Sequence, residues 1–390
     1  MTVIALILVF LPAIIACYAY VGYPLLLRIV AAFSADDSRL SDAELPYVTV
    51  VIPAYNEEAQ IRGAIESQLA QDYPANRRQI LILSDASTDD TDSIVGEYAS
   101  RGVELLRMPT RGGKTAAENA SVAHIRGEVV INSDASVRMN PRAVGYLAEA
   151  MRNPTVGVAS TRDVSVAGHG DASNAAEAGY VGYEMRIREL ETAAGGIVGA
   201  SGSGYAIRKV LHRNPVRADL SRDFSAALTA HRYGFRAVSV EPAICYVPRT
   251  ASLRTEYKRK VRTIARGMNT LFFNRELLDP IRHGAFAWKL ISHKLCRWLV
   301  PLSTSFSLVG LLMLAPSFVW ARVLLAGAVV IAGVAFAGTR WPEDRRVPRW
   351  LPVGALAANL AVVHAAWRFF QGEDNQIWEP TRRPRAVTVA

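Results

Sequence analysis

Cysteine and histidine are scarce in this sequence of 390 residues, which contains three cysteines and seven histidines. Cys17, Cys245 and Cys296 show no paired spacing, and Cys17 falls within a long apolar run. Disulfide frameworks and structural zinc sites need clustered or regularly spaced cysteines. The scarcity therefore argues against both kinds of site.

A Walker A loop is also missing, because the sequence around Gly112, Gly113 and Lys114 lacks the full GxxxxGK[ST] spacing. Lysine and arginine outnumber aspartate and glutamate by 44 to 35, which gives a formal net charge of +9. These basic residues cluster around hydrophobic segments and do not follow a continuous groove pattern, which argues against nucleic-acid binding. We expect the positive charge to mark the cytoplasmic side of a membrane.

Hydrophobic residues make up 51% of the sequence, and the excess is concentrated at its two ends. Residues 3–27 contain no charge, and roughly 20 apolar residues suffice to cross a bilayer. A cleaved signal peptide fits less well, because the run lacks a basic lead-in and Arg28 follows it. We therefore expect a retained transmembrane helix within residues 1–33.

Further apolar segments occupy residues 299–370, where we expect two or three crossings. Residues 299–338 are long enough for two, whereas 350–367 is shorter and fits a position within the membrane interface as well. The arginines between these segments predict a cytoplasmic loop and a cytoplasmic polar middle; they are Arg340, Arg345, Arg346 and Arg349. A third crossing would place the basic tail, residues 371–390, outside, so both counts stay open.

The segment just before these crossings, residues 280–298, has the pattern of an interfacial amphipathic helix. Lys289, His293 and Arg297 recur at four-residue steps, and apolar residues with a tryptophan lie elsewhere on the helical wheel. Such a helix is expected to hold the polar middle of the chain against the bilayer.

The polar middle, residues 46–275, alternates strand and helix patterns. Apolar runs rich in β-branched residues predict strands at 47–53, 79–85, 103–109 and 128–134. Amphipathic segments with acidic first turns, terminal glycines or an initial proline predict a helix after each of them. This alternation predicts an α/β fold with a mostly parallel sheet that is covered on both faces.

Polar residues follow several of these strands where they end. Asp85 and Asp134 each stand in a Ser-Asp-Ala-Ser sequence, and Glu57 follows the first strand. Lys114 opens a helix after two glycines, a position that the helix dipole disfavours unless an anion lies nearby. An aspartate in such a place can simply cap the next helix. Because parallel α/β sheets bind ligands at the carboxyl ends of their strands, however, the combination favours a ligand site.

The motifs VTVVIPAYNEE, LSDASTDDT, GGKTAAEN and VVINSDAS, in this order, resemble those of the family 2 glycosyltransferases. The resemblance implies a Rossmann-like GT-A catalytic domain flanked by transmembrane helices, a nucleotide-diphosphate-sugar donor and inversion at the anomeric carbon. It implies that Ala54, Tyr55, Glu57 and Asp85 contact the nucleoside, beside Lys114 in the GGK motif.

The same resemblance implies a metal ion at Asp134, which matches the first aspartate of the family's D-x-D motif. Mg²⁺ or Mn²⁺ there would hold the diphosphate, because hard cations prefer carboxylate oxygens and a phosphate leaving group gains charge. Ser136 stands where the family usually has the second aspartate, and a neutral hydroxyl is a weaker ligand.

Asp223 stands where the family carries its catalytic base, usually in a Glu-Asp pair, and Arg222 replaces the glutamate here. A base at this position would remove the proton of the acceptor hydroxyl. An alternative is an aspartate that only stabilises a helix N-terminus. The stretch before it suggests an acceptor-side loop at Gly202, Ser203 and Gly204, because glycines let a ligand approach the backbone.

Residues 255–273 read as an amphipathic helix, with an apolar stripe from Tyr257 to Leu271 and an arginine face. Arg259 and Arg262 stand where processive relatives carry Q-x-x-R-W, and the resemblance suggests that they grip the diphosphate, since guanidinium groups suit phosphate oxygens. Contact with anionic lipid is the alternative.

The expected function is therefore that of a membrane-bound inverting glycosyltransferase acting on a lipid-linked or polysaccharide acceptor, with a UDP-sugar as the favoured donor. The resemblance is of the exopolysaccharide type, which implies membrane lipids and polysaccharide-assembly proteins as partners. It also implies a multi-pass protein of the bacterial inner membrane with a cytoplasmic catalytic domain. A processive hyaluronan- or chitin-like synthase and a non-catalytic sugar-nucleotide binder stay open as alternatives.

Overall fold

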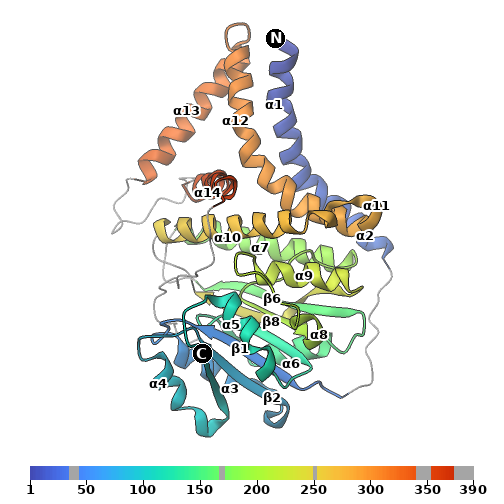
Figure 1. The fold of residues 1–390 in the computed structure, drawn as a ribbon. Helices are drawn as coiled ribbons and strands as arrows, with labels where there is room; N and C mark the ends of the chain where they lie inside the picture. Colours follow the sequence, from blue (N-terminus) through green and yellow to red (C-terminus); the bar gives the residue numbers. More distant parts are fainter. Residues whose placement is uncertain (35–43, 167–171, 249–252, 340–352, 373–390) are drawn as a thin grey trace.

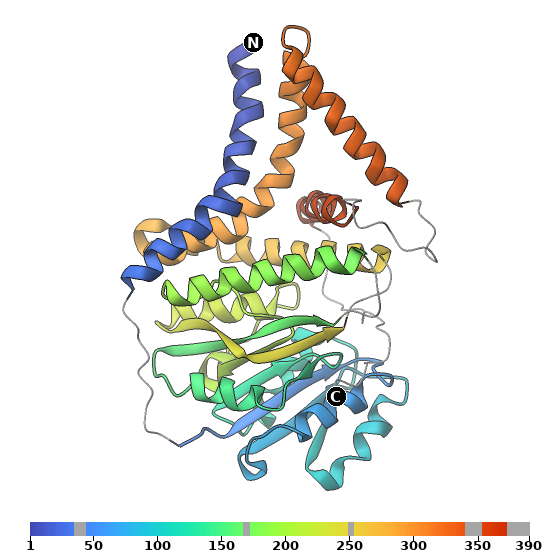
Figure 2. The same ribbon diagram turned by 180° about the vertical axis from the view of Figure 1, so that it is seen from behind.

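The computed structural model describes residues 1–34, 44–166, 172–248, 253–339 and 353–372. An α/β domain carries a layer of helices on one side, and long apolar helices project from that layer (Figures 1 and 2). The basic loop around Arg345 and the tail from residue 373 onward lie outside the described residues.

The first half of the sheet consists of parallel strands, as predicted. They lie in the order β3-β2-β1-β4, and their bounds are β1 Val48–Ala54, β2 Arg78–Ser84, β3 Val103–Arg107 and β4 Val129–Ser133. Their carboxyl ends share one edge of the sheet because parallel strands point the same way. The residues that follow β1, β2 and β4 are therefore brought together.

The second half of the sheet is mixed, so the sheet as a whole is mostly parallel, as expected, with antiparallel strands in this half. The full order is β3-β2-β1-β4-β7-β6-β8-β5. Strand β7 runs antiparallel to both β4 and β6, whereas β8 is parallel to β6 and antiparallel to β5. These strands, which lie beyond the last predicted one, are β5 Arg138–Met139, β6 Val156–Val166, β7 Gly204–Arg208 and β8 Arg236–Pro248.

A helix follows each of the four predicted strands, as expected, and further helices of the α/β domain lie beyond them. Their bounds are α3 Ile61–Leu69, α4 Thr91–Gly96, α5 Lys114–Ala120, α6 Ala143–Ala150, α7 Ala172–Ala193, α8 Lys209–His212 and α9 Arg222–Arg232. Short 3₁₀ turns occupy Ala75–Arg77, Ala99–Arg101, Ser121–His124 and, beyond the domain, Arg275–Leu278. Gly102 follows the second of these turns with φ 82°, a conformation that glycine adopts without steric cost.

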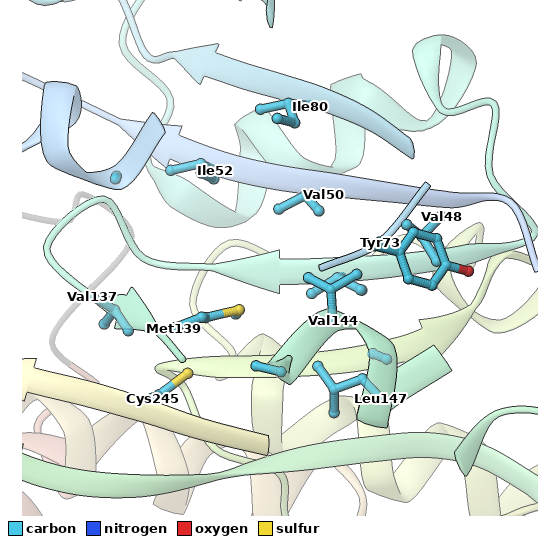
Figure 3. Packing of buried hydrophobic residues seen from close by; sticks show 14 of the residues in the cluster. Val48, Val50, Ile52, Tyr73, Ile80, Val137, Met139, Val144, Leu147 and Cys245 are labelled. Carbon is cyan, nitrogen blue, oxygen red and sulfur yellow. The ribbon is translucent and has the colours of Figure 1, made fainter. Parts of the chain in front are cut away.

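The core of the α/β domain lies on both faces of the sheet. Val50 and Ile52 of β1 point to one face, where they pack with Leu147 of α6 (Figure 3). Val51 points to the other face and packs with Leu83. Complete burial of each such side chain contributes about 1.5–3 kcal/mol, so β1 is fixed in the interior of the sheet, between β2 and β4.

Helices outside the α/β domain form a basal layer and a projecting group (Figure 1). Their bounds are α1 Thr2–Cys17, α2 Tyr23–Phe33, α10 Leu253–Phe273, α11 Pro280–Leu290, α12 Cys296–Leu314, α13 Val319–Thr339 and α14 Val353–Phe370. Helices α2, α10 and α11 make up the basal layer, and α1, α12 and α13 project from it (Figure 1). By length and composition, two continuous helical stretches of the described chain could cross a membrane: Thr2–Phe33 and Pro280–Leu314. A shorter apolar stretch is Val319–Val334.

Helices α1 and α12 project side by side from the basal layer (Figures 1 and 2). Gly310 of α12 permits this approach, since a Cβ atom there would lie 2.7 Å from the carbonyl oxygen of Ala5. Close packing through small residues is typical of helices in membranes.

A π-helical turn interrupts each of the two long helices at the basal layer. The turns are Tyr18–Gly22 and Ile291–Leu295, and they meet through a hydrogen bond of 2.7 Å between the hydroxyls of Tyr18 and Ser292. Trp288 Nε1 also donates to Tyr18 Oη at 2.9 Å. Such turns bend helices, so these contacts join the two bends.

The polar face expected on residues 280–298 is buried instead of facing lipid headgroups. Lys289, His293 and Arg297 are 3%, 2% and 7% exposed. Lys289 Nζ donates to the carbonyl oxygens of Ala194 and Gly196. This segment also continues through α12 without forming a separate helix, so its cations hold the second long helix against the α/β domain.

Two glutamates of α7 receive this buried face. His293 lies between Glu191, 2.7 Å from Nδ1, and Glu184, 2.9 Å from Nε2. Arg297 Nη1 donates to Glu184 at 2.7 Å, and Tyr23 Oη donates to Glu191 at 2.5 Å. Each ring nitrogen of His293 thus faces a carboxylate oxygen of α7. Burial raises the pKa of Glu184, but His293 and Arg297 outweigh it and hold that pKa well below its usual range.

Replacing Glu184 by Gln should lower the free energy of unfolding by about 3–5 kcal/mol, because it removes the carboxylate that pairs with the buried guanidinium of Arg297. Glu189→Gln on the same helix is the matched control. Its pair with Arg186 is exposed, so the loss should stay below about 1 kcal/mol. Denaturant unfolding in detergent measures both, and equal losses would contradict the buried network.

Candidate active site

The carboxylate of Asp85 fixes the loop that precedes α5. Asp85 directly follows β2, and its two oxygens accept hydrogen bonds from the backbone amides of Gly112 and Gly113, each at 2.8 Å. Gly113 has φ 85°, which favours glycine, and it is the residue before α5. Asp85 thus positions the first turn of α5 and, with it, Lys114.

The tips of β1 and β2 are linked to each other. Asp85 donates its backbone amide to Ala54 at 2.9 Å, and Asn56 Oδ1 accepts from the backbone amide of Thr88 at 2.8 Å. Ala86 has φ 57°, a strained conformation for a residue with a Cβ atom that costs of order 1–3 kcal/mol. Such strain is concentrated at functional sites.

Two further residues expected at the nucleoside lie in the same region. Glu57 is buried, and its backbone amide donates to Thr91 Oγ1 at 2.8 Å. The guanidinium of Arg111 stacks 3.8 Å from the centre of the Tyr55 ring. Arg111 directly precedes the glycine pair, and nothing in the sequence alone marks it as a site residue. The stacked Tyr55 and Arg111 offer a flat, cationic surface beside Asp85.

Lys114 and Asp134 form an ion pair at this edge, with 2.5 Å between Nζ and Oδ1. Their side chains are 22% and 30% exposed, so the pair is accessible from outside. Burial opposes the charge of Lys114, but Asp134, Glu118 and Asp223 outweigh it and raise the pKa of the lysine above its usual range. The lysine is therefore a cation at neutral pH, and carboxylates surround it.

Asp223 occupies the first turn of α9 in the same region. We call this region the rim; it comprises the carboxyl ends of β1, β2 and β4 and the first turns of α5 and α9. Its Oδ1 accepts from Ser221 Oγ at 2.5 Å, and a Cβ atom at Gly202 would lie 3.1 Å from its Oδ2. Its charge also acts on Lys114. The structure thus brings Asp85, Lys114, Asp134 and Asp223 to one region, as the sequence predicted.

The loop expected on the acceptor side is held by Asp163, which sequence analysis missed. The hydroxyls of Ser201 and Ser203 donate to Asp163 Oδ2 at 2.6 and 3.2 Å. Gly202 lies against Asp223, whereas the space at Gly204 is closed by the side chains of Met139, Thr161 and Cys245. Packing therefore explains Gly204, and only Gly202 lies directly at the candidate base.

The arginines of α10 differ in what they contact. Arg259 forms an ion pair with Glu256, at 2.9 and 2.6 Å, and Arg262 is half-buried. Arg266 contacts the site region, because its Nη2 donates to Thr115 Oγ1 and to the carbonyl oxygens of Ala218 and Leu220. The sequence shows three arginines on one helix and does not distinguish which one reaches α5.

Two more charged residues, Glu118 and Arg222, lie buried behind this rim. The sequence marks Arg222 only as a departure from the family pattern and gives Glu118 no distinguishing signal. Their burial is the distinguishing feature, and it depends on how α5 and α9 pack.

The donor set at Asp134 suits a cation that is bound together with a phosphate. No group of three or more His, Cys, Asp or Glu side chains that could hold a metal is found among residues 1–34, 44–166, 172–248, 253–339 and 353–372. Mg²⁺ commonly binds through one or two carboxylates, waters and substrate phosphates. Asp134, partly exposed and followed by Ser136, fits that type of site.

Residues 49–212 match the model of the glycosyl transferase family 2. The chain is 25% identical over 169 residues to a beta-monoglucosyldiacylglycerol synthase of Nostoc sp., covering 42% of this chain and 36% of that protein. It is 36% identical over 99 residues to a dolichyl-phosphate beta-glucosyltransferase, ALG5D, of Trichomonas vaginalis, covering 23% and 30%. The chain thus spans about a third of the length of these curated relatives.

The fold resembles that of the mannosyltransferase PcManGT from Pyrobaculum calidifontis, solved in complex with GDP-Man and Mn²⁺. The TM-score is 0.69 at 22% identity, covering 95% of this chain and 99% of that chain. The likeness shows a GT-A fold and, because it covers nearly all of both chains, it includes the helices outside the α/β domain.

Proposed function

We propose that this chain, which belongs to the family 2 glycosyltransferases, transfers a sugar from a nucleoside-diphosphate sugar to a lipid-linked acceptor at a membrane surface. The observation that carries the proposal is the ion pair between Lys114 and Asp134, accessible from outside and close enough to Asp223 for their charges to interact. A diphosphate needs cations, and the acceptor hydroxyl needs a base. Both are supplied on one rim.

The donor would lie along the edge formed by β1, β2 and β4. The stacked Tyr55 and Arg111 and the region of Asp85 suit a nucleoside, and Lys114 suits the phosphates. A UDP-sugar remains our first candidate. Because the structural neighbour binds GDP-Man, a guanosine donor is the second.

The reaction we propose inverts the anomeric carbon in one displacement. The acceptor oxygen forms a bond to that carbon while the bond from the carbon to the diphosphate oxygen breaks. The carboxylate of Asp223 takes the acceptor proton, and the nucleoside diphosphate leaves with the bond's electron pair. Lys114 stabilises the charge that develops on the leaving group.

A divalent cation, Mg²⁺ or Mn²⁺, would be held by Asp134 together with the donor's phosphates. It would supply electrostatic stabilisation of the diphosphate. The neutral hydroxyl of Ser136 adds little charge, so the donor's own oxygens would complete the site.

The acceptor we propose is lipid-linked for two reasons. The relatives from Nostoc and Trichomonas are named for a diacylglycerol product and a dolichyl-phosphate substrate. In this chain, Arg266 links the site to α10, and α10 belongs to the layer beneath the projecting apolar helices (Figure 1). An acceptor embedded in lipid would thus lie about one helix diameter, roughly 10 Å, from the site.

Purified full-length protein in detergent should turn over at least one nucleotide sugar in a screen of UDP- and GDP-sugars with and without Mn²⁺. Asp223→Asn should lower turnover at least 10²-fold while the donor Kd changes little, because the asparagine cannot take the proton. Asp279→Asn is the matched control, since Asp279 accepts from backbone amides at the start of α11. Full activity of Asp223→Asn would refute its role, and no turnover of any donor would count against the proposed function.

The membrane arrangement we propose has α1, α12 and α13 crossing the bilayer and α14 lying in the plane of its cytoplasmic surface. Helices α1 and α12 stand upright on the layer, whereas α14 is seen end-on in both views (Figures 1 and 2). In this proposal α14 lies on the same side as the α/β domain, and residues 299–370 contribute two crossings.

The burial pattern of α14 supports this position. One face, with Ala361, Val362, Ala365 and Ala366, packs on Val261, Ala265 and Met268 of α10, from the predicted apolar stripe or beside it. The other face is apolar and exposed: Leu360, Val363, Trp367 and Phe370 are 51%, 38%, 64% and 81% exposed. A helix with lipid on one side and protein on the other satisfies both faces in the interface.

Spin labels at positions 360, 363, 367 and 370 of protein in liposomes should report one shallow membrane depth. These positions span about 15 Å along a helix, so a crossing helix would give a depth that changes steadily from label to label. Oxygen and nickel-chelate accessibility measures the depth. Labels at 7, 11 and 14 on α1 provide the graded reference, and a graded series on α14 would contradict the in-plane position.

A further inference from the structure

Glu118 of α5 and Arg222 of α9 face each other beneath the candidate site. Arg222 Nε lies 3.5 Å from Glu118 Oε2, and the two side chains are 6% and 1% exposed. Lys114 precedes Glu118 by one helical turn on the same face of α5, and Asp223 follows Arg222 directly. The pair therefore joins the helix that carries the cation to the helix that carries the candidate base.

Arg222 is tied to α5 and its surroundings by further contacts. Its Nη1 donates to Asn119 Oδ1 at 2.5 Å, and its Nη2 donates to the carbonyl oxygen of His212 at 3.3 Å. Asn119 in turn donates from Nδ2 to the carbonyl oxygen of Val216 at 2.7 Å. The guanidinium is thus used inside the protein, where it fixes the first turn of α9 against α5.

Glu118 is an unusual partner, because neither of its carboxylate oxygens accepts a hydrogen bond from the part of the chain that the structure describes. Burial raises its pKa, Lys114 and Arg222 lower it, and Asp134 and Asp223 raise it further. Glu118 therefore interacts with every charged group of the proposed phosphate and base sites. Its main interaction with them is electrostatic.

We propose that Glu118 and Arg222 are a positioning pair that sets the separation between Lys114 on α5 and Asp223 on α9. The inference rests on the proposed function. Arg222 directly precedes the candidate base, and Glu118 supplies the opposite charge from α5.

Stability alone does not explain the pair. A buried ion pair is often no more stable than neutral side chains of similar size, whereas removing one partner leaves a costly unpaired charge. A misplacement of about 1 Å in a reacting group can cost about 10²-fold in rate. A positioning role and a purely structural role therefore predict different results for single and double replacements.

The test compares Glu118→Gln, Arg222→Met and the double variant in the full chain. We expect kcat to fall at least tenfold in all three, with a donor Kd within about threefold of wild type, because Lys114 and Asp134 remain. The single variants should also melt about 5 °C or more below wild type, and the double variant should regain most of that loss because no unpaired buried charge remains.

Arg208→Met is the matched control. Arg208 donates to the carbonyl oxygens of Met151, Asn153 and Val156, and it pairs with Val129 at the opposite end of β4 from Asp134. This variant should melt lower and keep its kcat.

A double variant with wild-type kcat would overturn the positioning role and leave the pair structural. A donor affinity that falls as much as kcat would also overturn it, because the pair would then act on donor binding. If the wild-type protein turns over no donor, the proposed function fails, and the positioning role fails with it; the melting temperatures distinguish that outcome from simple misfolding.

Discussion

The charge of Lys114 at the first turn of α5 is the constraint on which the rest of the site depends. A cation there is opposed by the helix dipole and by burial, and three carboxylates compensate for it: Asp134, Glu118 and Asp223. Each comes from a different part of the fold, namely the end of β4, α5 itself and the first turn of α9. Asp85 fixes the loop before the lysine. The positions of these carboxylates are thus tied to the positive charge of Lys114.

The same helix, α5, links the site to the basal layer. Arg266 of α10 bonds to Thr115 of α5, and α14 packs on the opposite side of α10. A second connection runs from α7 through Glu184 and Glu191 to His293 and Arg297 at the start of the second long helix. These buried polar contacts fix how the α/β domain faces the basal layer.

The parallel strands and the residues at their tips could be predicted from the sequence, because apolar runs and the residues after them are local signals. Asp85, Lys114 and Asp134 come together because each follows one of these parallel strands, whose carboxyl ends share one edge of the sheet. The antiparallel strand β7, the role of Arg266 among three arginines and the burial of His293 could not be predicted, since each depends on packing between segments far apart in the chain. The pattern of residues 280–298 misled for the same reason: a polar stripe indicates an amphipathic helix, and only the tertiary structure shows that glutamates of α7 cover the stripe.

The central claim is that Lys114 and Asp134 together hold a diphosphate with its cation, and calorimetric titration of UDP and GDP into the purified protein tests it most directly. We expect Mn²⁺ to strengthen binding of one of these nucleotides at least tenfold in the wild-type protein and to have no such effect in Asp134→Asn, while Lys114→Met weakens binding with or without the metal. Nucleotide binding that is unchanged by both replacements would show that the diphosphate lies elsewhere and would contradict the account.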